Sequence, residues 1–472
     1  MKSAKQNHHN WGTVFAQLNI KKIRANRWLC MKRFFLIIVI LSGFAIPVKA
    51  ESHFINKNAS RNNDGTSWQN AWISFDNIKW NQVNPGDTIF ISGGSSYNET
   101  LEVQADGTIA RPIVIMKGLS QGHDGTVIFD GANIANSGIM LINKKYVLIQ
   151  SLEFKNFIGN GAIYIDQSEG IKVDSCQIMA AGHGAIFIQR SKNCSISNNR
   201  ITTSTNTDRQ TDGIYSQLNS NNIYEGNQII ISNQNIAPHC DGIQMYLDTD
   251  MTVRNNYIEQ NNNKKFNAQG IYATDCYGTI ECYNNIVLGA NTENALLTLA
   301  NYSEGNAKLI AYHNTLVGGG WGTLHLKDTP NSIVKNNILV NEKPNSWLVN
   351  LEGSIADPNQ INFNLYFAPN SSIVATHHNI GKNWSEWKNL GFESNGIKAD
   401  PLFIDLINQD FRLSKNSPAI DSGFPHSHPY DKDKNGIIRP IGNGFDLGAL
   451  EFINDGTAPN PPQNVQVSPD PN

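Results

Sequence analysis

The stretch Gly242-Ile243-Gln244-Met245 is one copy of a motif that recurs through residues 161–326. Each copy has a small residue, an aliphatic residue, a polar or aromatic residue and then a further apolar or small residue. The central aliphatic positions are 163, 186, 214, 243, 271, 297 and 324, so successive copies lie 23, 28, 29, 28, 26 and 27 residues apart. A motif that returns in phase at this interval predicts a solenoid, in which each repeat packs on the next.

A second motif, Asn-x-aliphatic, keeps step with the first. It is read at Asn199, Asn227, Asn256, Asn284, Asn314 and Asn336, with Cys176 in the equivalent place one repeat earlier. The local pattern alternates with period two, and a repeat is too short for a strand–helix–strand unit of about 30 residues. We therefore predict an all-β fold, a right-handed parallel β-helix of about ten or more coils with three short strands per coil. The aliphatic residues would form its core, and the asparagines would form a hydrogen-bonded ladder inside a turn.

Composition restricts the class of partner. The 472 residues carry a net charge of -3 with a pI near 6.5, and only 16% of them are charged. No basic face is implied, so nucleic acid is not an expected partner, whereas an extracellular polysaccharide is compatible with this charge. We expect a monomer.

The N-terminal region has the pattern of an export signal. Met31-Lys32-Arg33 is basic, residues 34–46 are apolar, and Val48-Lys49-Ala50 places small residues at a cleavage site. We predict a signal peptide over 31–50 and a secreted or cell-surface protein, with residues 1–30 as a misassigned upstream extension. The apolar run is too short to span a bilayer, so no membrane span is expected.

The remaining chain divides into further segments. Residues 51–84 contain Trp68, Trp72, Phe75 and Trp80 at helical spacing, which predicts an N-terminal cap with a short amphipathic helix over 68–82. The β-helix is expected over 85–365, a C-terminal module over 366–455 and a Pro-rich linker over 456–472.

Two blocks of sequence resemble known families. Pro85-Gly86-Asp87-Thr88-Ile89, Arg111-Pro112-Ile113-Val114-Ile115 and Val127-Ile128-Phe129-Asp130-Gly131 resemble the opening coils of secreted, pectate-lyase-like right-handed β-helix proteins. Ser417-Pro418-Ala419-Ile420-Asp421-Ser422-Gly423 and Asp446-Leu447-Gly448-Ala449-Leu450-Glu451 are similar to the choice-of-anchor-Q module. The first resemblance implies the fold and not the reaction, and the second implies export and a C-terminal cap.

The outward position of the repeated strand suggests a binding surface. Because stacked coils lie about 4.8 Å apart, equivalent residues of adjacent repeats become neighbours. That position holds, in order, Tyr164, Phe187, Tyr215, Gln244, Tyr272, Thr298 and His325. A row of aromatic rings beside amides is suited to stacking on a sugar chain. The alternative is that long loops cover this face and the aromatic rings pack beneath them.

The residues just before each strand suggest a reacting centre. Asp212 and Asp241 directly precede successive copies of the motif, His183 precedes Gly184 at the equivalent place one repeat earlier, and His239 lies two residues before Asp241. We predict that these four residues converge at one edge of the groove, with Asp241 at the surface. The alternative is that an Asp before Gly is an ordinary turn residue.

Such a cluster supports more than one chemistry. Two close carboxylates repel, so that one pKa rises and the pair can act as acid and base on a glycosidic bond. Alternatively, Asp212 and Asp241 could bind Ca²⁺ against a uronate carboxylate while a histidine removes a proton, which gives β-elimination. The expected substrate-binding residues are Tyr164, Phe187, Tyr215, Gln244, Tyr272, His325, Arg209, Lys264 and Lys327.

Three functions compete at this point. The first is a polysaccharide lyase that cleaves an acidic glycan. The second is a glycan-binding or surface-adhesion protein without catalysis, and the third is a sugar epimerase or a glycoside hydrolase.

Overall fold

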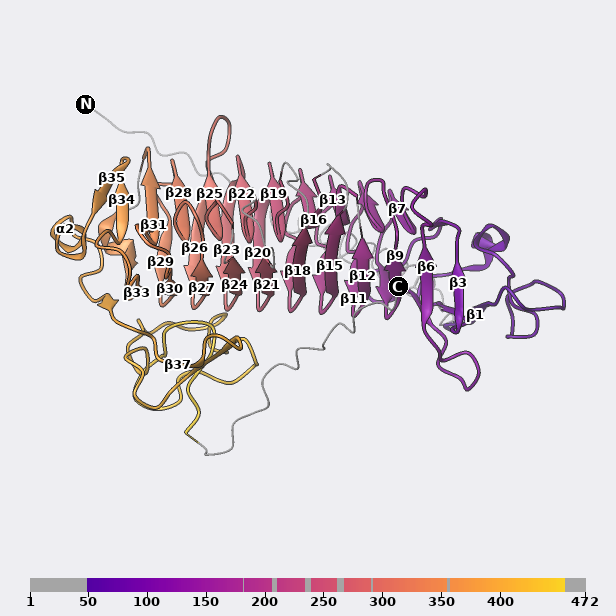
Figure 1. Ribbon diagram of the computed structural model, residues 1–472. Coiled ribbons are helices and arrows are strands. Elements are labelled where there is room, and N and C mark those ends of the chain that lie inside the picture. The colour runs from indigo at the N-terminus through magenta and orange to yellow at the C-terminus, as the bar shows by residue number, and fades with distance from the viewer. Residues whose placement is uncertain are drawn as a thin grey trace, which may run out of the picture. The chain divides into compact units, whose positions relative to one another are not determined.

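The computed structural model describes residues 49–180, 182–205, 210–233, 239–260, 267–289, 292–354 and 357–454. The described coils belong to one compact unit that begins at Glu51. Three 12-stranded sheets run along it, and each coil contributes one strand to each sheet (Figure 1). The chain is thus a right-handed parallel β-helix, as predicted.

The first sheet contains β1 (Ser52–Ile55), β2 (Thr88–Ile91), β5 (Ile113–Lys117), β8 (Val147–Gln150), β11 (Lys172–Asp174), β14 (Ser195–Ser197), β17 (Ile223–Glu225), β20 (Thr249–Arg254), β23 (Tyr277–Tyr283), β26 (Lys308–Tyr312), β29 (Ile333–Lys335) and β32 (Ile361–Asn362). The second contains β3 (Ser95–Tyr97), β6 (Val127–Asp130), β9 (Glu153–Lys155), β12 (Gln177–Ala180), β15 (Arg200–Thr205), β18 (Gln228–Asn233), β21 (Tyr257–Gln260), β24 (Ile286–Gly289), β27 (Thr315–Gly318), β30 (Ile338–Val340), β33 (Leu365–Phe367) and β36 (Ile397–Lys398).

The third sheet carries the repeated motif. It contains β4 (Leu101–Glu102), β7 (Ile139–Ile142), β10 (Ile163–Asp166), β13 (Gly184–Gln189), β16 (Asp212–Gln217), β19 (Ile243–Tyr246), β22 (Ile271–Thr274), β25 (Leu297–Ala300), β28 (Leu324–Lys327), β31 (Val349–Glu352), β34 (Ala375–His377) and β35 (Ile380–Lys382). The central aliphatic residues pair in register from β10 to β28 and are buried, which confirms the predicted inward stack.

An asparagine ladder runs through one turn of successive coils. Its members are Asn199, Asn227, Asn256, Asn285, Asn314, Asn337 and Asn364, and each side-chain oxygen accepts the backbone N–H of the member before it. Cys176 donates its N–H to Asn199, as its equivalent place predicts.

The ladder corrects the sequence reading at two Asn-Asn pairs. The reading placed Asn284 and Asn336 in the ladder, whereas the structure uses the next residue in both cases. Asn284 and Asn336 have φ of 55° and 61°, and their amides turn away to donate to the carbonyls of Lys432 and Phe424. Asparagine tolerates this left-handed conformation well, so the first residue of each pair makes the turn and the second enters the ladder.

Replacing Asn256 by Ala tests the ladder. The buried Asn256 amide donates to Tyr224 O at 2.9 Å and to Asn285 Oδ1 at 3.0 Å, and it accepts the Asn227 N–H at 2.9 Å. Because Ala leaves these buried groups without partners, the free energy of unfolding should fall by about 2–4 kcal/mol. Urea unfolding measures this, with Asn58→Ala, at an exposed asparagine, as the control. An equal, small effect of both substitutions would contradict the ladder's role.

The N-terminal region corrects the expected cap helix. Over 68–82 the chain forms two 3-10 turns, η1 (Phe75–Asn77) and η2 (Trp80–Gln82), in place of one helix. The Trp72 N–H donates to Phe54 O at 2.9 Å, and its carbonyl accepts the Asn56 N–H at 2.8 Å. The backbone at Trp72 therefore pairs with β1 and cannot make helical hydrogen bonds. Trp72 and Phe75 are nevertheless buried against the first coils, and β1 itself lies within the segment expected to be the cap.

The C-terminal segment covers the last coil with a helix and then packs, through its hairpin and loops, on earlier coils from Asn255 onward. The helix α2 (Trp384–Asn389) buries Trp387, whose ring stacks on Phe392 at 4.0 Å. A short turn, η3 (Pro358–Gln360), and an antiparallel hairpin of β37 (Phe403–Asp405) and β38 (Asp410–Leu413) complete the elements (Figure 1). Arg439, from the loops after the hairpin, reaches His313 of the β-helix at 2.8 Å. Among the described residues, no helix is long and apolar enough to cross a membrane.

A buried carboxyl group predicts a pH-dependent stability. Asp248 is buried, accepts the Asn219 N–H at 2.7 Å and accepts the Ser216 hydroxyl. Burial raises the pKa of Asp248 to about 7. The folded state then keeps a proton that the unfolded chain, with a carboxyl pKa near 4, releases. This contribution is fully present below about pH 4 and is lost as the pH rises to about 7.

Asp248→Asn should remove that part of the pH dependence. We compare the free energy of unfolding of the variant with that of the unsubstituted protein at the same pH. This difference should be higher at about pH 8 than at about pH 4, by about 2–4 kcal/mol in favour of the variant. Urea unfolding at both pH values measures the change, and other titrating groups cancel because both proteins share them. Parallel pH profiles for the two proteins would contradict a raised pKa at Asp248.

Candidate functional site

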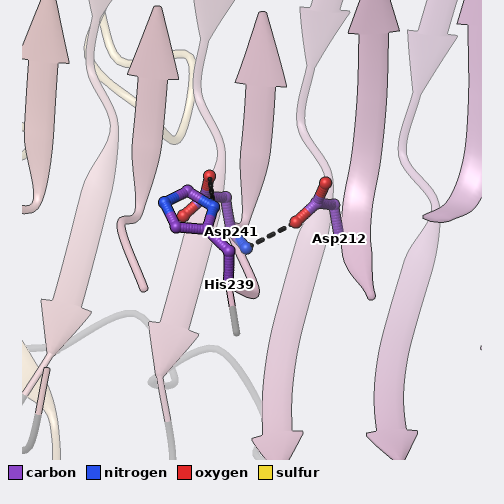
Figure 2. Close-up of side chains that lie close together, drawn as sticks. All are labelled: Asp212, His239 and Asp241. Carbon is purple, nitrogen blue, oxygen red and sulfur yellow. Dashed lines mark hydrogen bonds and ion pairs between the residues drawn. The ribbon is translucent and has the colours of Figure 1, made fainter. Parts of the chain in front are cut away.

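Asp212, His239 and Asp241 come together at one edge of the third sheet (Figure 2). Asp212 is the first residue of β16, and Asp241 lies one coil further on, just before β19. One side-chain donor atom from each residue lies within 4.8 Å of the others. Both carboxylates are fully buried, while the His239 side chain is 21% exposed. Three of the four residues predicted to converge therefore do so, but Asp241 is not at the surface, and of these three only His239 is exposed to a ligand.

One oxygen of each carboxylate accepts a hydrogen bond from the backbone of the next coil. Asp212 Oδ1 accepts the Asp241 N–H at 2.7 Å, and Asp241 Oδ1 accepts the Gln269 N–H at 2.7 Å. The glycine after each aspartate lets the coils approach, because a Cβ on Gly213 would lie 2.5 Å from the Gly242 carbonyl oxygen. Each aspartate therefore does serve as a turn residue, as the sequence allowed, and this role uses one of the two oxygens of its carboxylate.

The other oxygens face the polar side chains of the cluster. Asp241 Oδ2 lies 3.0 Å from His239 Nδ1, and Asp212 Oδ2 accepts from Gln210 Nε2 at 3.0 Å. The Gln244 amide lies against Oδ2 of both aspartates, and its oxygen accepts from Gln210 Nε2 at 2.7 Å. Gln244, expected to bind substrate, is therefore part of the cluster.

The sequence reasoning missed Gln210. A signal for it exists, because Gln210 lies two residues before Asp212 just as His239 lies two residues before Asp241. Equivalent positions of adjacent coils thus supply one side-chain partner for each carboxylate.

The cluster keeps more protons than its groups would in water. Burial raises the pKa of Asp212 well above its ordinary value, and the charge of Asp241 adds to this. Burial also raises the pKa of Asp241, although His239 opposes the shift. For His239, burial acts to lower the pKa, but the Asp241 carboxylate raises it and the net shift is upward. All three shifts are upward, so these groups hold their protons to higher pH than they would in water.

The donor set does not fit the calcium ion considered from the sequence. Ca²⁺ takes six to eight oxygen ligands. Here Oδ1 of Asp212 and of Asp241 each accept a backbone N–H, the Gln244 amide lies against both Oδ2 atoms, and the third donor is a histidine nitrogen.

The outward row has the predicted register. Each member from Tyr164 to His325 pairs with its equivalent on the next strand. The rings of Phe187 and Tyr215 meet edge to face at 4.8 Å, and the Tyr272 ring lies 5.5 Å from the His239 ring. Side chains from Tyr164 to Tyr272 are partly exposed, so an accessible row passes directly beside the cluster.

At the far end of the row, His325 is buried, and Lys327 remains partly exposed but contacts other side chains. His325 is only 3% exposed, because the Trp321 ring packs 5.0 Å from its ring. Lys327 pairs with Glu352 at 3.3 Å and lies over the Tyr302 ring at 5.0 Å. A ligand could not reach His325 without moving Trp321, so the accessible row ends near Tyr272. Arg209 and Lys264, also expected to bind substrate, lie outside the described residues.

His183 lies apart from the three clustered residues. Its ring packs 4.5 Å from the Tyr215 ring and 5.5 Å from the Phe187 ring. It lines a cavity of about 530 Å³, whose other lining residues are Asn136, Gly159, Asn160, Phe187 and Gln210. Since Gln210 also donates to Asp212, the cavity and the cluster share a wall.

Comparison with known proteins agrees with the fold. Residues 137–315 match a family described as the right handed beta helix region. No curated protein matches the sequence. The structure is similar to that of pectate lyase Pel9A, with 15% identity, a TM-score of 0.53, and coverage of 86% of this chain and 98% of that chain.

Two further structures are more distant. A rhamnogalacturonan lyase matches with 13% identity and a TM-score of 0.41, over 84% of this chain and 96% of its own. PfbA, a surface adhesin of Streptococcus pneumoniae, matches with 12% identity and a TM-score of 0.41, over 71% of this chain and 94% of its own. At these identities the likeness to Pel9A shows the fold alone, and the chemistry has to be argued from the cluster.

Proposed function

We propose that the protein is a carbohydrate-active enzyme that cleaves an acidic polysaccharide by β-elimination, with His239 as the reacting group. One observation carries this proposal. A partly exposed imidazole, held by a buried carboxylate at 3.0 Å, stands beside an accessible row of aromatic rings. Aromatic faces stack on sugar rings, and an imidazole oriented by a carboxylate is a suitable general base.

The proposed chemistry uses the chain's own residues. A uronate unit lies on Tyr272 beside His239, the next sugar of the chain extends toward Tyr215, and neutral His239 takes the proton from the carbon next to the uronate carboxyl group. The released electron pair forms a carbon–carbon double bond and the bond to the glycosidic oxygen on the neighbouring carbon breaks. That oxygen takes a proton from water, and His239 later releases its proton to solvent. Asp241 holds the ring and stabilises the imidazolium that forms. From their places in the sequence, we propose that Arg209 and Lys264 pair with the uronate carboxylate.

The pH dependence follows from the shifted pKa of His239. Only the unprotonated ring can act as a base, and its pKa lies above the ordinary 6.5. We therefore expect kcat/KM to rise as the pH increases through an apparent pKa above that value, and then to level off. A rate that falls over the same range would show that the protonated ring is the active form.

A panel of polysaccharides tests the reaction type. The full chain is incubated with acidic and neutral polysaccharides while the ultraviolet absorbance of unsaturated products and the number of reducing ends are followed. A rise in both signals supports β-elimination. Reducing ends without unsaturated products would indicate a glycoside hydrolase, and the reaction should not respond to a calcium chelator.

Glycan binding without catalysis is the second candidate function. It is favoured by the structural use of Asp212 and Asp241, each of which gives one oxygen to a neighbouring coil. Under this alternative the row holds a glycan, no member of the panel is cleaved, and His239→Ala changes only binding.

Export to the cell surface or medium completes the proposal. It is supported by the signal-like pattern over 31–50 and by the resemblance of the C-terminal segment to a choice-of-anchor-Q module. The N-terminal residue of the exported protein should be Glu51, and size-exclusion chromatography should give the mass of a monomer.

A further inference from the structure

The cavity beside His183 has hydrogen-bonding groups that the protein does not use. Among the described contacts, the side-chain amides of Asn136 and Asn160 and the ring nitrogens of His183 have no hydrogen-bond partner. The cavity therefore offers two amides and an imidazole to a ligand. The Phe187 ring forms part of its wall.

The described residues that line the cavity carry no charge. None of the described residues that line it is a carboxylate, lysine or arginine, and burial lowers the pKa of His183, so its ring is neutral near pH 7. The nearest basic residue along the strand of Phe187 is Arg190, which follows β13 and forms two hydrogen bonds with Asp166, at 2.9 and 2.5 Å. A carboxylate placed in the cavity would find no cation to pair with among these residues.

Its position relates the cavity to the proposed centre. Phe187 is on β13 and His239 precedes β19, so the two lie two coils apart along the third sheet. Gln210 connects them, because it lines the cavity and donates to Asp212. A polysaccharide that follows the row from Tyr272 past Tyr215 reaches the cavity next.

We propose that this cavity is a subsite for an uncharged sugar unit of the polysaccharide, held by the Phe187 ring and by the amides of Asn136 and Asn160. The inference rests on the proposed function and extends it, because the substrate would then carry an uncharged sugar a short distance from the uronate at His239. An apolar ring with a few converging polar groups is how proteins bind small neutral ligands. The substrate class is a mixed polysaccharide rather than a polymer of uronate alone.

Binding to a variant that cannot turn over substrate provides the test. His239→Ala, made in the full chain, is titrated calorimetrically with neutral oligosaccharides and with oligouronates of equal length, and then with mixed oligomers. Mixed oligomers should bind most tightly. Phe187→Ala should weaken their binding by about tenfold or more, with Asn160→Ala somewhat less, while Asn58→Ala should have no effect. Phe187→Leu, which keeps apolar volume without the aromatic face, should weaken binding without a change in thermal stability.

A change of charge gives the sharpest comparison. Asn160→Lys should lower the affinity for mixed and neutral oligomers and raise that for oligouronates, so that the preference shifts by about tenfold or more. The proposal is overturned if pure oligouronates bind the original cavity most tightly, if no oligomer containing a neutral sugar binds, or if the Phe187 variants bind as well as Asn58→Ala does. If pure polyuronates are cleaved and the Phe187 substitutions have no effect, the subsite proposal is contradicted while the lyase proposal stands. If neutral sugars bind and no polysaccharide is cleaved, the subsite proposal stands while the lyase proposal is contradicted.

Discussion

His239→Ala is expected to lower the rate of polysaccharide cleavage by a factor of about 100 to 10,000, the usual contribution of a positioned general base. Of Asp212, His239 and Asp241 only His239 is partly exposed, and the neighbouring Gln210 and Gln244 amides cannot act as a general base in its place. Initial rates on the best member of the panel measure the effect. His378→Ala, at an exposed histidine that follows β34, is the matched control and should keep full activity.

Asp241→Asn should act on the same step. It removes the charge that orients the ring and stabilises the imidazolium formed in the reaction, and we expect a loss of activity of about a hundredfold at a pH where the ring is unprotonated in both proteins. The sequence suggested a surface position and little effect on folding, but the structure buries Asp241 and gives it the Gln269 N–H to accept. Thermal unfolding must therefore be measured beside the rate. Full activity in this variant would mean that the aspartate serves only the turn.

Ile243→Asp is expected to prevent stable folding, with a loss of more than about 4 kcal/mol in the free energy of unfolding. Ile243 is fully buried between Ile214 and Ile271 of the adjacent coils, and a carboxylate there would have neither water nor a partner. Circular dichroism and urea unfolding measure the result.

The matched control is Ile142→Asp, on β7 of the same sheet, where the side chain is 38% exposed. This change should cost no more than about 1 kcal/mol, as is usual for an exposed site. Similar losses in the two variants would mean that the inward stack contributes little to stability.

The sequence predicted the β-helix well because its signal is periodic. An aliphatic residue that returns in phase has one arrangement that buries every copy, and the register from Ile163 to Leu324 follows directly. The Asn-Asn pairs were read one residue too early, since the two asparagines are alike in type and only backbone conformation separates them. The helix predicted over 68–82 does not form. The aromatic residues have helical spacing, but the backbone of Trp72 pairs with β1 instead.

The sequence predicted which site residues of adjacent coils are neighbours, but not how deeply each of them is buried. Alignment of repeats places Asp212 one coil from Asp241 and Tyr272 beside His239, and both relations hold. It cannot say which carboxylate oxygen a neighbouring N–H occupies. It also cannot say that Trp321, from a turn rather than from the row, covers His325.

The masses of the products of cleavage test the central claim most directly. The wild-type chain and His239→Ala are incubated with the same acidic polysaccharide, and the oligosaccharides released are measured by mass spectrometry. We predict that wild-type products carry an unsaturated terminal sugar, lighter by one water than a hydrolysis product, and that His239→Ala releases almost none. Products of hydrolytic mass, or equal amounts of unsaturated product from both proteins, would contradict His239 as the base of a polysaccharide lyase.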